Sequence, residues 1–339
     1  MGVRQYQLLN EIITNILVFY FNVKIFYMIN YKSTKLLIFI SILCFQSMKA
    51  QDVNKFKLED DIIVFPIKII DAFPMIGGEA NGLKGYFFFD TGLNTAIEIN
   101  HNFVPLDKDK SKEIGNAFTG SGQNFEIRLN DNINEVKLIN GLTFKNLNNI
   151  QSGNFQHIQN VTTVDCLGYI GYEFFEGYIA KMDYVRRRLT FYKNSEERQK
   201  SKDFLQNENI IAVLDFKLLK LKNIPVLMGK IGDIELQIAM DTGQYGMLQI
   251  VEEDKSKLIQ QNILKALSPS LFNINEIILD NKYSTKLKGI YLITDESKAY
   301  AKKPIQISTV NFLSLGHRLL DEYNTVWDYE NKKLYLLER

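Results

Sequence analysis

Two aspartates in this sequence each follow a short apolar run and precede Thr-Gly. Residues 87–89 lead into Asp90, and residues 238–240 lead into Asp241. An Asp directly after apolar strand residues lies at a strand end, and the Gly that follows allows a tight turn and the close approach of another backbone. Two carboxyl groups brought face to face cannot both ionise cheaply, so they share one proton. The ionised member can take a proton from water while the protonated member hydrogen-bonds a carbonyl under attack, which is suited to peptide hydrolysis.

The two Asp-Thr-Gly segments belong to a tandem duplication. Aligning Asp90 with Asp241, a shift of 151, also pairs Pro74 with Pro225 and Gly78 with Gly229. Later in each copy the shift is 145: residues 169–175 align with 314–320, 182–184 with 327–329 and 189–191 with 334–336. The shift falls from 151 to 145, so six residues are missing from the middle of the second copy. Such self-similarity predicts two copies of one structural unit.

Composition limits the other possibilities. The chain has 339 residues, 46% of them hydrophobic, with a formal net charge of +1, 23 Phe, 17 Tyr and 6 Pro. This balance favours many short strands and suggests neither nucleic acid nor an acidic surface as partner. Three His and two Cys, scattered along the chain, do not have the spacing of a zinc or iron site, so we predict no metal and no cofactor. Cys166 is expected to be a small buried residue, and His157 and His317 to be surface or partly buried histidines rather than catalytic bases.

The N-terminal part has the pattern of a signal peptide. A basic segment with Lys32 and Lys35 precedes the apolar run 36–45, and a small residue, Ala50, follows. We predict cleavage between Ala50 and Gln51 and export to the periplasm or the extracellular space. An uncleaved membrane anchor is the alternative, although the apolar run is too short for a stable membrane span. A lipoprotein reading of Cys44 is disfavoured by the preceding Leu43, and residues 1–27 are interpreted as a misassigned start or a disordered segment.

Turn residues and apolar runs predict the elements that position the aspartates. Residues 62–70 and 96–99 are expected to be strands, and Asn81-Gly82 marks a hairpin. Residues 118–125 form a second hairpin whose glycine-rich tip is either a surface turn or a mobile cover over a site. A helix is expected over residues 256–267. The predicted division is an N-terminal extension and signal peptide (1–50), lobe 1 (51–193), a polar linker (194–209) and lobe 2 (210–339).

These motifs resemble the aspartic peptidases, and among them the retropepsin-like proteins. The resemblance rests on Asp-Thr-Gly at 90–92 and 241–243, on the apolar-Gly blocks ending at Gly171 and Gly316, and on the hairpins that follow them. It implies an all-β fold of two tandem retropepsin-like β-barrel lobes with few short helices and the active cleft between the lobes. Retropepsins reach two aspartates by dimerising, whereas this chain resembles two such units fused into a monomer.

Carried over to this sequence, the resemblance implies a role for each matched residue. Asp90 and Asp241 would be the catalytic pair. Thr91, Gly92, Thr242 and Gly243 would support it, with the two threonines hydrogen-bonding between the lobes. The hairpin containing Phe118, Gly120, Ser121 and Gly122 would be the flap that closes over substrate. Residues 281–286, taken as its counterpart in the second copy, lack glycine, so one working flap is expected.

The sequence departs from the family pattern directly after each Asp-Thr-Gly. Leu93 and Gln244 stand where the family usually has Ser, Thr or Ala, and a lost hydroxyl donor would alter the pKa values of the pair. The main prediction is an aspartic endopeptidase acting on peptide or protein substrates. The alternative is a secreted, non-catalytic peptide-binding descendant, and a third possibility is two independent barrels. The stretch from Gln51 to the first strand is too short for an ordinary inhibitory propeptide, so no zymogen step is expected.

Overall fold

Alternating burial explains why β1 (Ile62–Ile70) is a strand. Ile63 and Phe65 are buried, whereas Ile62 and Val64 are exposed. Successive side chains of a strand point to opposite faces, so one face of β1 packs on the core. Other apolar runs in the chain form strands of the same kind.

The computed structural model describes residues 56–120, 122–131 and 133–339. The predicted extension and signal peptide, with the processing site at Ala50-Gln51, lie outside the described residues. Ser121 of the predicted flap also lies outside them.

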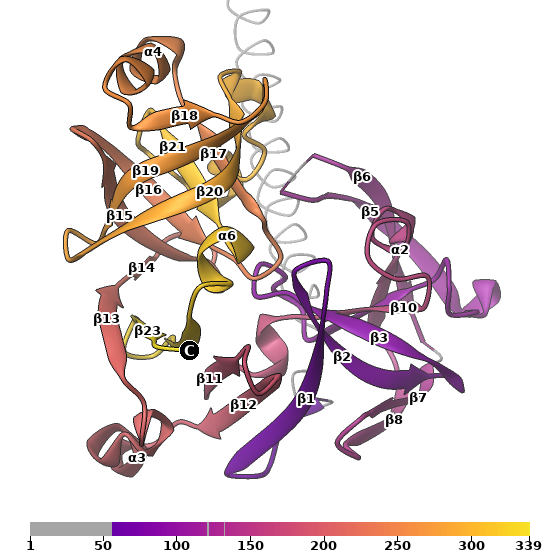
Figure 1. Cartoon of the computed structure of the whole chain (residues 1–339). Coiled ribbons are helices and arrows are strands. Elements are labelled where there is room, and N and C mark those ends of the chain that lie inside the picture. The colour runs from indigo at the N-terminus through magenta and orange to yellow at the C-terminus, as the bar shows by residue number, and fades with distance from the viewer. Residues whose placement is uncertain (1–55, 121, 132) are drawn as a thin grey trace, which may run out of the picture. The chain divides into compact units, whose positions relative to one another are not determined.

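The first copy supplies most of the indigo and magenta strands of Figure 1. Its strands are β1 (Ile62–Ile70), β2 (Phe73–Ala80), β3 (Leu83–Phe89), β4 (Ile97–Asn100), β5 (Ser111–Phe118), β6 (Asn124–Asn130), β7 (Ile133–Leu138), β8 (Thr143–Leu147), β9 (Ile150–Gly153), β10 (Cys166–Ile170), β11 (Tyr178–Asp183) and β12 (Arg188–Lys193). Its short helices are η2 (Lys108–Lys110), α2 (Gln156–Gln159) and η3 (Tyr172–Phe174).

The second copy supplies the orange and yellow strands. These are β13 (Ile210–Asp215), β14 (Lys217–Leu218), β15 (Pro225–Ile231), β16 (Ile234–Met240), β17 (Gly246–Gln249), β18 (Leu264–Ala266), β19 (Leu271–Leu279), β20 (Tyr283–Ile293), β21 (Phe312–Leu315), β22 (Asn324–Asp328) and β23 (Lys333–Leu337). Helices α4 (Glu252–Gln260), η5 (Glu296–Lys298), α5 (Lys302–Ile305) and α6 (His317–Leu320) connect them. The predicted all-β fold with few short helices is confirmed.

The strand order repeats between the copies. In lobe 1 the neighbours run β2-β3-β10-β4-β9, and in lobe 2 they run β15-β16-β21-β17-β20. The first strand of each of these orders also pairs with a later strand: β2 pairs with β7 in lobe 1, and β15 pairs with β19 in lobe 2. The duplication seen in the sequence is therefore a duplication of topology.

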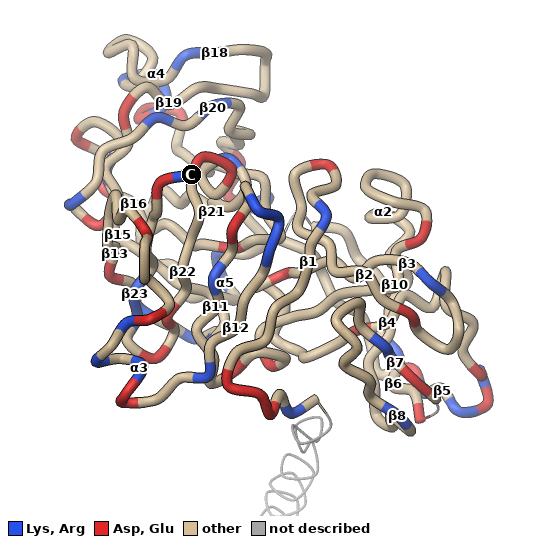
Figure 2. Tube along the Cα trace, turned by 60° about the horizontal axis from the view of Figure 1, so that its bottom comes forward, with Lys and Arg blue, Asp and Glu red and all other residues tan. Residues whose placement is uncertain are grey.

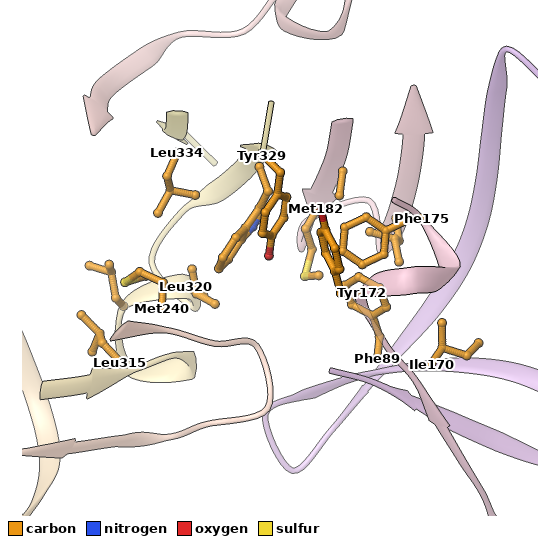
Figure 3. Packing of buried hydrophobic residues seen from close by; sticks show 14 of the residues in the cluster. Phe89, Ile170, Tyr172, Phe175, Met182, Met240, Leu315, Leu320, Tyr329 and Leu334 are labelled. Carbon is orange, nitrogen blue, oxygen red and sulfur yellow. The ribbon is translucent and has the colours of Figure 1, made fainter. Parts of the chain in front are cut away.

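A sheet shared by the two copies joins the lobes. Its order is β13-β23-β22-β11-β12-β1, and β11 pairs antiparallel with β22 at its centre, with Ala180 opposite Trp327 and Met182 opposite Thr325. The sheet is pseudo-symmetric, because β1 pairs with β12 as β13 pairs with β23. Tyr172 and Phe175 of lobe 1 face Tyr329 of lobe 2, with ring centroids 4.9 and 5.9 Å from the Tyr329 ring (Figure 3). The hydrophobic core thus continues from one lobe into the other.

The tight turns follow the residues that favour them. Asn81 and Gly82 connect β2 to β3 with φ values of 47° and 84°, as a two-residue hairpin requires. Arg187 and Lys332 occupy the matching turns of the two copies with φ values of 52° and 54°. The predicted hairpin at Asn81-Gly82 is confirmed.

The helix predicted over residues 256–267 is shifted. Helix α4 begins at Glu252, where three acidic residues occupy the first turn, and it ends at Gln260. Asn262 has a φ of 57°, and the Ile263 N–H donates to the Leu258 carbonyl at 2.9 Å. This is a left-handed C-terminal cap. The apolar residues beyond it enter β18 instead of extending the helix.

Between β12 and β13, residues 194–209 fold as two short helices, α3 (Glu196–Ser201) and η4 (Asp203–Leu205). The Arg198 guanidinium lies 2.8 Å from the Asp61 carboxylate and 3.0 Å from that of Asp203. Phe204 is fully buried. The segment predicted as a polar linker therefore packs on the structure: Arg198 is paired with Asp61, just before β1, and Phe204 packs with Ile179 and Tyr335 of the shared sheet.

Charged residues of both signs are dispersed along the described trace (Figure 2). In the described part of the chain, no helix combines the length and the apolar character needed to cross a membrane.

Candidate active site

Asp90 and Asp241 stand at equivalent strand ends. Asp90 follows β3, which pairs in parallel with β10, and the Asp90 N–H donates to the Ile170 carbonyl at 3.0 Å. Asp241 follows β16, which pairs in parallel with β21, and its N–H donates to the Leu315 carbonyl at 3.0 Å. In both lobes, the last hydrogen bond of a parallel pair therefore fixes where the carboxyl group leaves the sheet.

The two carboxyl groups meet across the lobes, and each glycine contacts the opposite aspartate. The Gly92 N–H lies 2.7 Å from Asp90 Oδ1 and 3.0 Å from Asp241 Oδ1, while the Gly243 N–H donates to Asp241 Oδ1 at 2.8 Å. A Cβ on Gly92 would lie 2.3 Å from Asp241 Oδ2, and one on Gly243 would lie 2.5 Å from the Asp90 carboxyl group. Glycine is needed at both positions because any side chain would collide with the facing carboxyl group.

Thr91 and Thr242 tie the two segments together. The Thr91 N–H donates to Thr242 Oγ1 at 2.9 Å, and the Thr242 N–H donates to Thr91 Oγ1 at 3.0 Å. Thr242 Oγ1 in turn donates to the Phe89 carbonyl at 3.1 Å. Both threonines are buried, where unmade hydrogen bonds are costly. The reciprocal bonds hold the two Asp-Thr-Gly segments at a fixed separation.

A third glycine in each lobe supports the aspartate loop from behind. A Cβ on Gly171 would lie 2.4 Å from the Thr95 carbonyl oxygen, and one on Gly316 would lie 2.2 Å from the Asp241 carbonyl oxygen. The next N–H in each copy closes the loop: Tyr172 donates to Leu93 at 2.8 Å, and His317 donates to Gln244 at 2.7 Å. The second block of sequence similarity therefore packs directly on the first.

Asn223, which sequence reasoning missed, adds a contact present in one lobe alone. Its side-chain amide donates to the carbonyls of Thr91 and Gly92 at 3.1 and 2.6 Å. The alignment at a shift of 151 places Ala72 at the corresponding position of the first copy, so no repeat pattern could have identified it. Two side-chain hydrogen bonds from lobe 2 thus hold the Asp-Thr-Gly loop of lobe 1.

Electrostatics distinguish the two carboxyl groups. Burial raises the pKa of Asp90 well above its ordinary value, and the Asp241 charge together with a hydrogen bond between the two groups raises it further. Burial also raises the pKa of Asp241, but the hydrogen bond from Asp90 and those from Gly243 and Gly92 act in the opposite direction. The two carboxyl groups therefore titrate as one coupled pair that shares a proton.

Leu93 and Gln244 differ in their surroundings. Leu93 packs on a cluster formed by Phe73, Met75, Phe88, Phe155 and Tyr169, here called the flap-side cluster, to which Phe125 and Tyr245 also belong as partly buried members. The Gln244 side chain instead faces the β5–β6 hairpin. The donors to the two carboxyl groups from the described residues are backbone N–H groups, so the usual hydroxyl support is replaced by backbone support.

The tip of the β5–β6 hairpin lies against lobe 2. A Cβ on Gly120 would lie 2.6 Å from Gln244 Nε2, and one on Gly122 would lie 2.2 Å from Tyr300 Cε2. The hairpin predicted as a flap thus reaches from lobe 1 to the residue that follows the second Asp-Thr-Gly. Phe118 is 65% exposed, so its ring does not cover the aspartates.

The counterpart of this hairpin in lobe 2 is not residues 281–286. Leu138 of β7 pairs with Gly78 as Leu279 of β19 pairs with Gly229, so the turn after Leu279 matches the turn between β7 and β8. The equivalent of β5–β6 is the short β18–β19 hairpin. The prediction misplaced the counterpart because β19 and β20 each combine what are two strands in lobe 1.

Glu98 is a buried carboxyl group that sequence reasoning did not single out. It is 5% exposed and accepts a hydrogen bond from Thr95 Oγ1 at 3.0 Å. Burial raises its pKa to about 7. It lies opposite Tyr169 across β4 and β10. Burial raises the pKa of the Tyr169 phenol well above its ordinary value, and the charges of Asp90, Glu98 and Asp241 raise it further. A Glu between two isoleucines of a strand buried on both faces was the signal that could have found it.

Neither a metal cluster nor a reactive cysteine accompanies the pair. No group of three or more His, Cys, Asp or Glu side chains in the described ranges could hold a metal ion. Cys166 is buried, as predicted, and burial raises its thiol pKa to about 12. A hollow of about 530 Å³ lies beside β6, lined in part by His101, Asn154 and His157. It belongs to lobe 1 and includes neither aspartate.

Comparisons with known proteins give distant structural similarity and no match by sequence. No family model matches the sequence, and no curated protein matches it. Among solved structures, the chain is similar to the crystal structure of basic 7S globulin from soybean, with a TM-score of 0.49 and 9% sequence identity over 82% of this chain and 95% of that chain. The resemblance to aspartic peptidases therefore rests on the residues of the site itself.

Proposed function

We propose that this chain is an aspartic endopeptidase whose single site is built from both copies. The observation that carries the proposal is the reciprocal contact between each glycine and the opposite aspartate, with Gly92 N–H lying within 3.0 Å of Asp241 Oδ1. Bringing two carboxyl groups together in a buried place is energetically unfavourable. A structural turn does not need that arrangement, whereas acid–base catalysis does.

In this mechanism Asp241 is the base and Asp90 the acid. Asp241 takes a proton from a water molecule as the water oxygen attacks the peptide carbonyl carbon, and Asp90 gives its proton to the carbonyl oxygen. The tetrahedral product collapses when the peptide nitrogen takes the proton held by Asp241 and one hydroxyl proton returns to Asp90. The C–N bond breaks, and the pair regains its starting state. Thr91 and Thr242 hold the geometry throughout.

The shared proton predicts the pH dependence of cleavage. Both pKa values are raised above 3.8, the ordinary value for Asp. Activity should fall on the acidic side when Asp241 also becomes protonated and on the basic side when Asp90 ionises, so the maximum should lie above pH 3.8. A peptide-library cleavage assay across the pH range measures it.

Single substitutions test whether one site uses both copies. Asp90→Asn and Asp241→Asn should each lower kcat/KM by roughly 10²–10⁴-fold, because each removes one of the two proton-transfer groups. Asp183→Asn is the matched control, since that buried aspartate bonds to Arg186 in the turn between β11 and β12, with the Arg186 N–H donating at 2.6 Å, and not to either Asp-Thr-Gly segment. Cleavage by Asp90→Asn or by Asp241→Asn at the wild-type rate would refute the shared site.

A non-catalytic peptide-binding protein is the second candidate. It is favoured by Leu93 and Gln244, which leave the carboxyl groups without a side-chain hydroxyl donor. It predicts that no peptide is cleaved at any pH, while wild type and both Asp→Asn variants bind the same peptides with similar affinity.

A further inference from the structure

The lobe-2 segment that follows Asp241 contacts lobe 1 at two consecutive residues. Gln244 lies against the hairpin tip at Gly120. Tyr245 reaches the turn between β1 and β2, where its hydroxyl lies 2.6 Å from the Asp71 carboxylate oxygen Oδ2 and 3.0 Å from the Asp71 carbonyl oxygen. One contact lies at the tip of the β5–β6 hairpin and the other at the turn between β1 and β2.

The Tyr245 ring is as well fixed as its hydroxyl. It packs edge-on against Phe73 with ring centroids 4.6 Å apart, and the Arg318 guanidinium lies over its other side, 5.7 Å from the ring centroid. Asp71 and Ala72 have φ values of 46° and 78°, a conformation that L-residues adopt at a cost. The turn is held in this conformation at the point where Tyr245 meets it.

This bridge lies next to the carboxyl pair. Tyr245 is the lobe-2 member of the flap-side cluster, which also includes Leu93 and Tyr169. Leu93 follows Asp90 by three positions and Tyr245 follows Asp241 by four, so the cluster includes a residue from each aspartate loop. On this side of the pair, side chains of both lobes therefore pack together in one cluster.

We infer that the Tyr245–Asp71 bridge limits the site to peptides that extend only a few residues past the carboxyl pair on that side. The substrates would be short peptides, or longer chains cleaved at an internal bond that lies only a few residues from one end. This inference rests on the proposed function for the location of the site. An extended peptide that continued farther would have to break the hydrogen bond to a charged acceptor and displace the ring from Phe73.

Binding of uncleavable peptides tests the inference independently of catalysis. A series with a reduced central peptide bond is extended one residue at a time at either end and titrated against the full wild-type chain by calorimetry. Affinity should fall roughly ten- to hundredfold beyond a few residues at one end, because the bridge must open, and should not fall at the other end. Tyr245→Ala should abolish the fall, and Tyr245→Phe, which keeps the ring, should reduce it.

The controls separate this inference from the proposed function. Tyr283→Phe removes a lobe-2 hydroxyl that bonds Tyr323 at 2.8 Å, and it should leave the length dependence unchanged. Equal affinity for all lengths in wild type, or the same length dependence in Tyr245→Ala, would overturn the inference even if peptides are cleaved. A length dependence that Tyr245→Ala removes would support it even if the cleavage assay finds no hydrolysis.

Discussion

A Cβ built on Gly92 would meet the Asp241 carboxyl group first, and one built on Gly243 would meet the Asp90 carboxyl group first. A conformational explanation alone would require a positive φ, yet neither Gly92 nor Gly243 has one. The constraint is the space occupied by a carboxyl group from the other lobe. The same residue type thus serves at Gly82 for its positive φ and at Gly92 for its missing side chain.

At the residue scale, the raised pKa of Asp90 lowers the stability of the folded chain at neutral pH. A carboxyl group whose pKa is higher in the folded state than in the unfolded state contributes stability that is complete below the unfolded value, 3.8, and is lost as the pH rises through the folded value. Asp90→Asn removes this loss. We therefore expect Asp90→Asn to unfold at a higher temperature than wild type at pH 7 and at a similar temperature at pH 3, as measured by calorimetry.

Wild type that is as stable as Asp90→Asn at pH 7 would contradict the raised pKa. Asp183→Asn again provides a control, because it removes a buried carboxylate that accepts hydrogen bonds from the Arg186 backbone and guanidinium. That substitution should lower stability at pH 7.

The aspartates could be predicted from the sequence because they occur twice in the same local context. Asn223 and Tyr245 could not. Asn223 and Tyr245 act on residues of the other lobe, and their positions in the first copy hold Ala72 and Asn94, so comparison of the copies conceals them. Their importance depends on contacts between parts of the chain that are distant in sequence.

At the scale of elements, the β5–β6 hairpin combines a flexible sequence with a defined contact. Gly122 has a φ of 89°, and a Cβ there would lie 2.2 Å from the Tyr300 ring. Gly115, in the same hairpin, has a φ of 135° and nothing within 4 Å of a built Cβ. Both glycines thus have a positive φ, but only Gly122 lies against a lobe-2 side chain, that of Tyr300.

Alanine at these two glycines separates the contact from the conformation. Both Gly122→Ala and Gly115→Ala should lower stability by about 1–2 kcal/mol, because both place an L-residue at positive φ. Only Gly122→Ala should also move the tip away from Tyr300 and lower kcat/KM, by up to about a hundredfold if the hairpin positions substrate. Steady-state kinetics beside thermal unfolding measure both effects. Equal kinetic losses in the two variants would show that the contact with Tyr300 has no role.

Turn chemistry predicted the elements better than periodicity did. The two-residue turn at Asn81-Gly82 and the hairpin at residues 118–125 follow from residues whose backbone preferences are local. The helix over residues 256–267 was displaced because a capping residue, Asn262, ended it before its apolar pattern did. The counterpart of the flap was misplaced because strands that are separate in one copy are continuous in the other.

At the scale of the whole molecule, the duplication explains both the symmetry of the site and its asymmetries. The shared sheet and the threonine pair follow a pseudo-twofold relationship. Asn223, Tyr245 and the long β5–β6 hairpin do not, and all three lie where the lobes meet at the site. A fused pair of copies can diverge in this way because each residue changes once, whereas in a symmetric dimer each change would appear twice.

Separate expression of the halves tests whether the lobes depend on each other. Dividing the chain between Lys193 and Asn194 would expose the central edge of the shared sheet and buried side chains such as Trp327 and Tyr329. Unpaired edges and apolar surface favour association, so each half alone should self-associate or aggregate.

Co-expressed halves should form a 1:1 complex, measured by size-exclusion chromatography with light scattering, and should recover peptide cleavage. Introducing Asp90→Asn into the first half alone should abolish that recovered cleavage without preventing the complex, because the site needs one aspartate from each half. Halves that remain folded monomers and do not associate would instead identify two independent barrels.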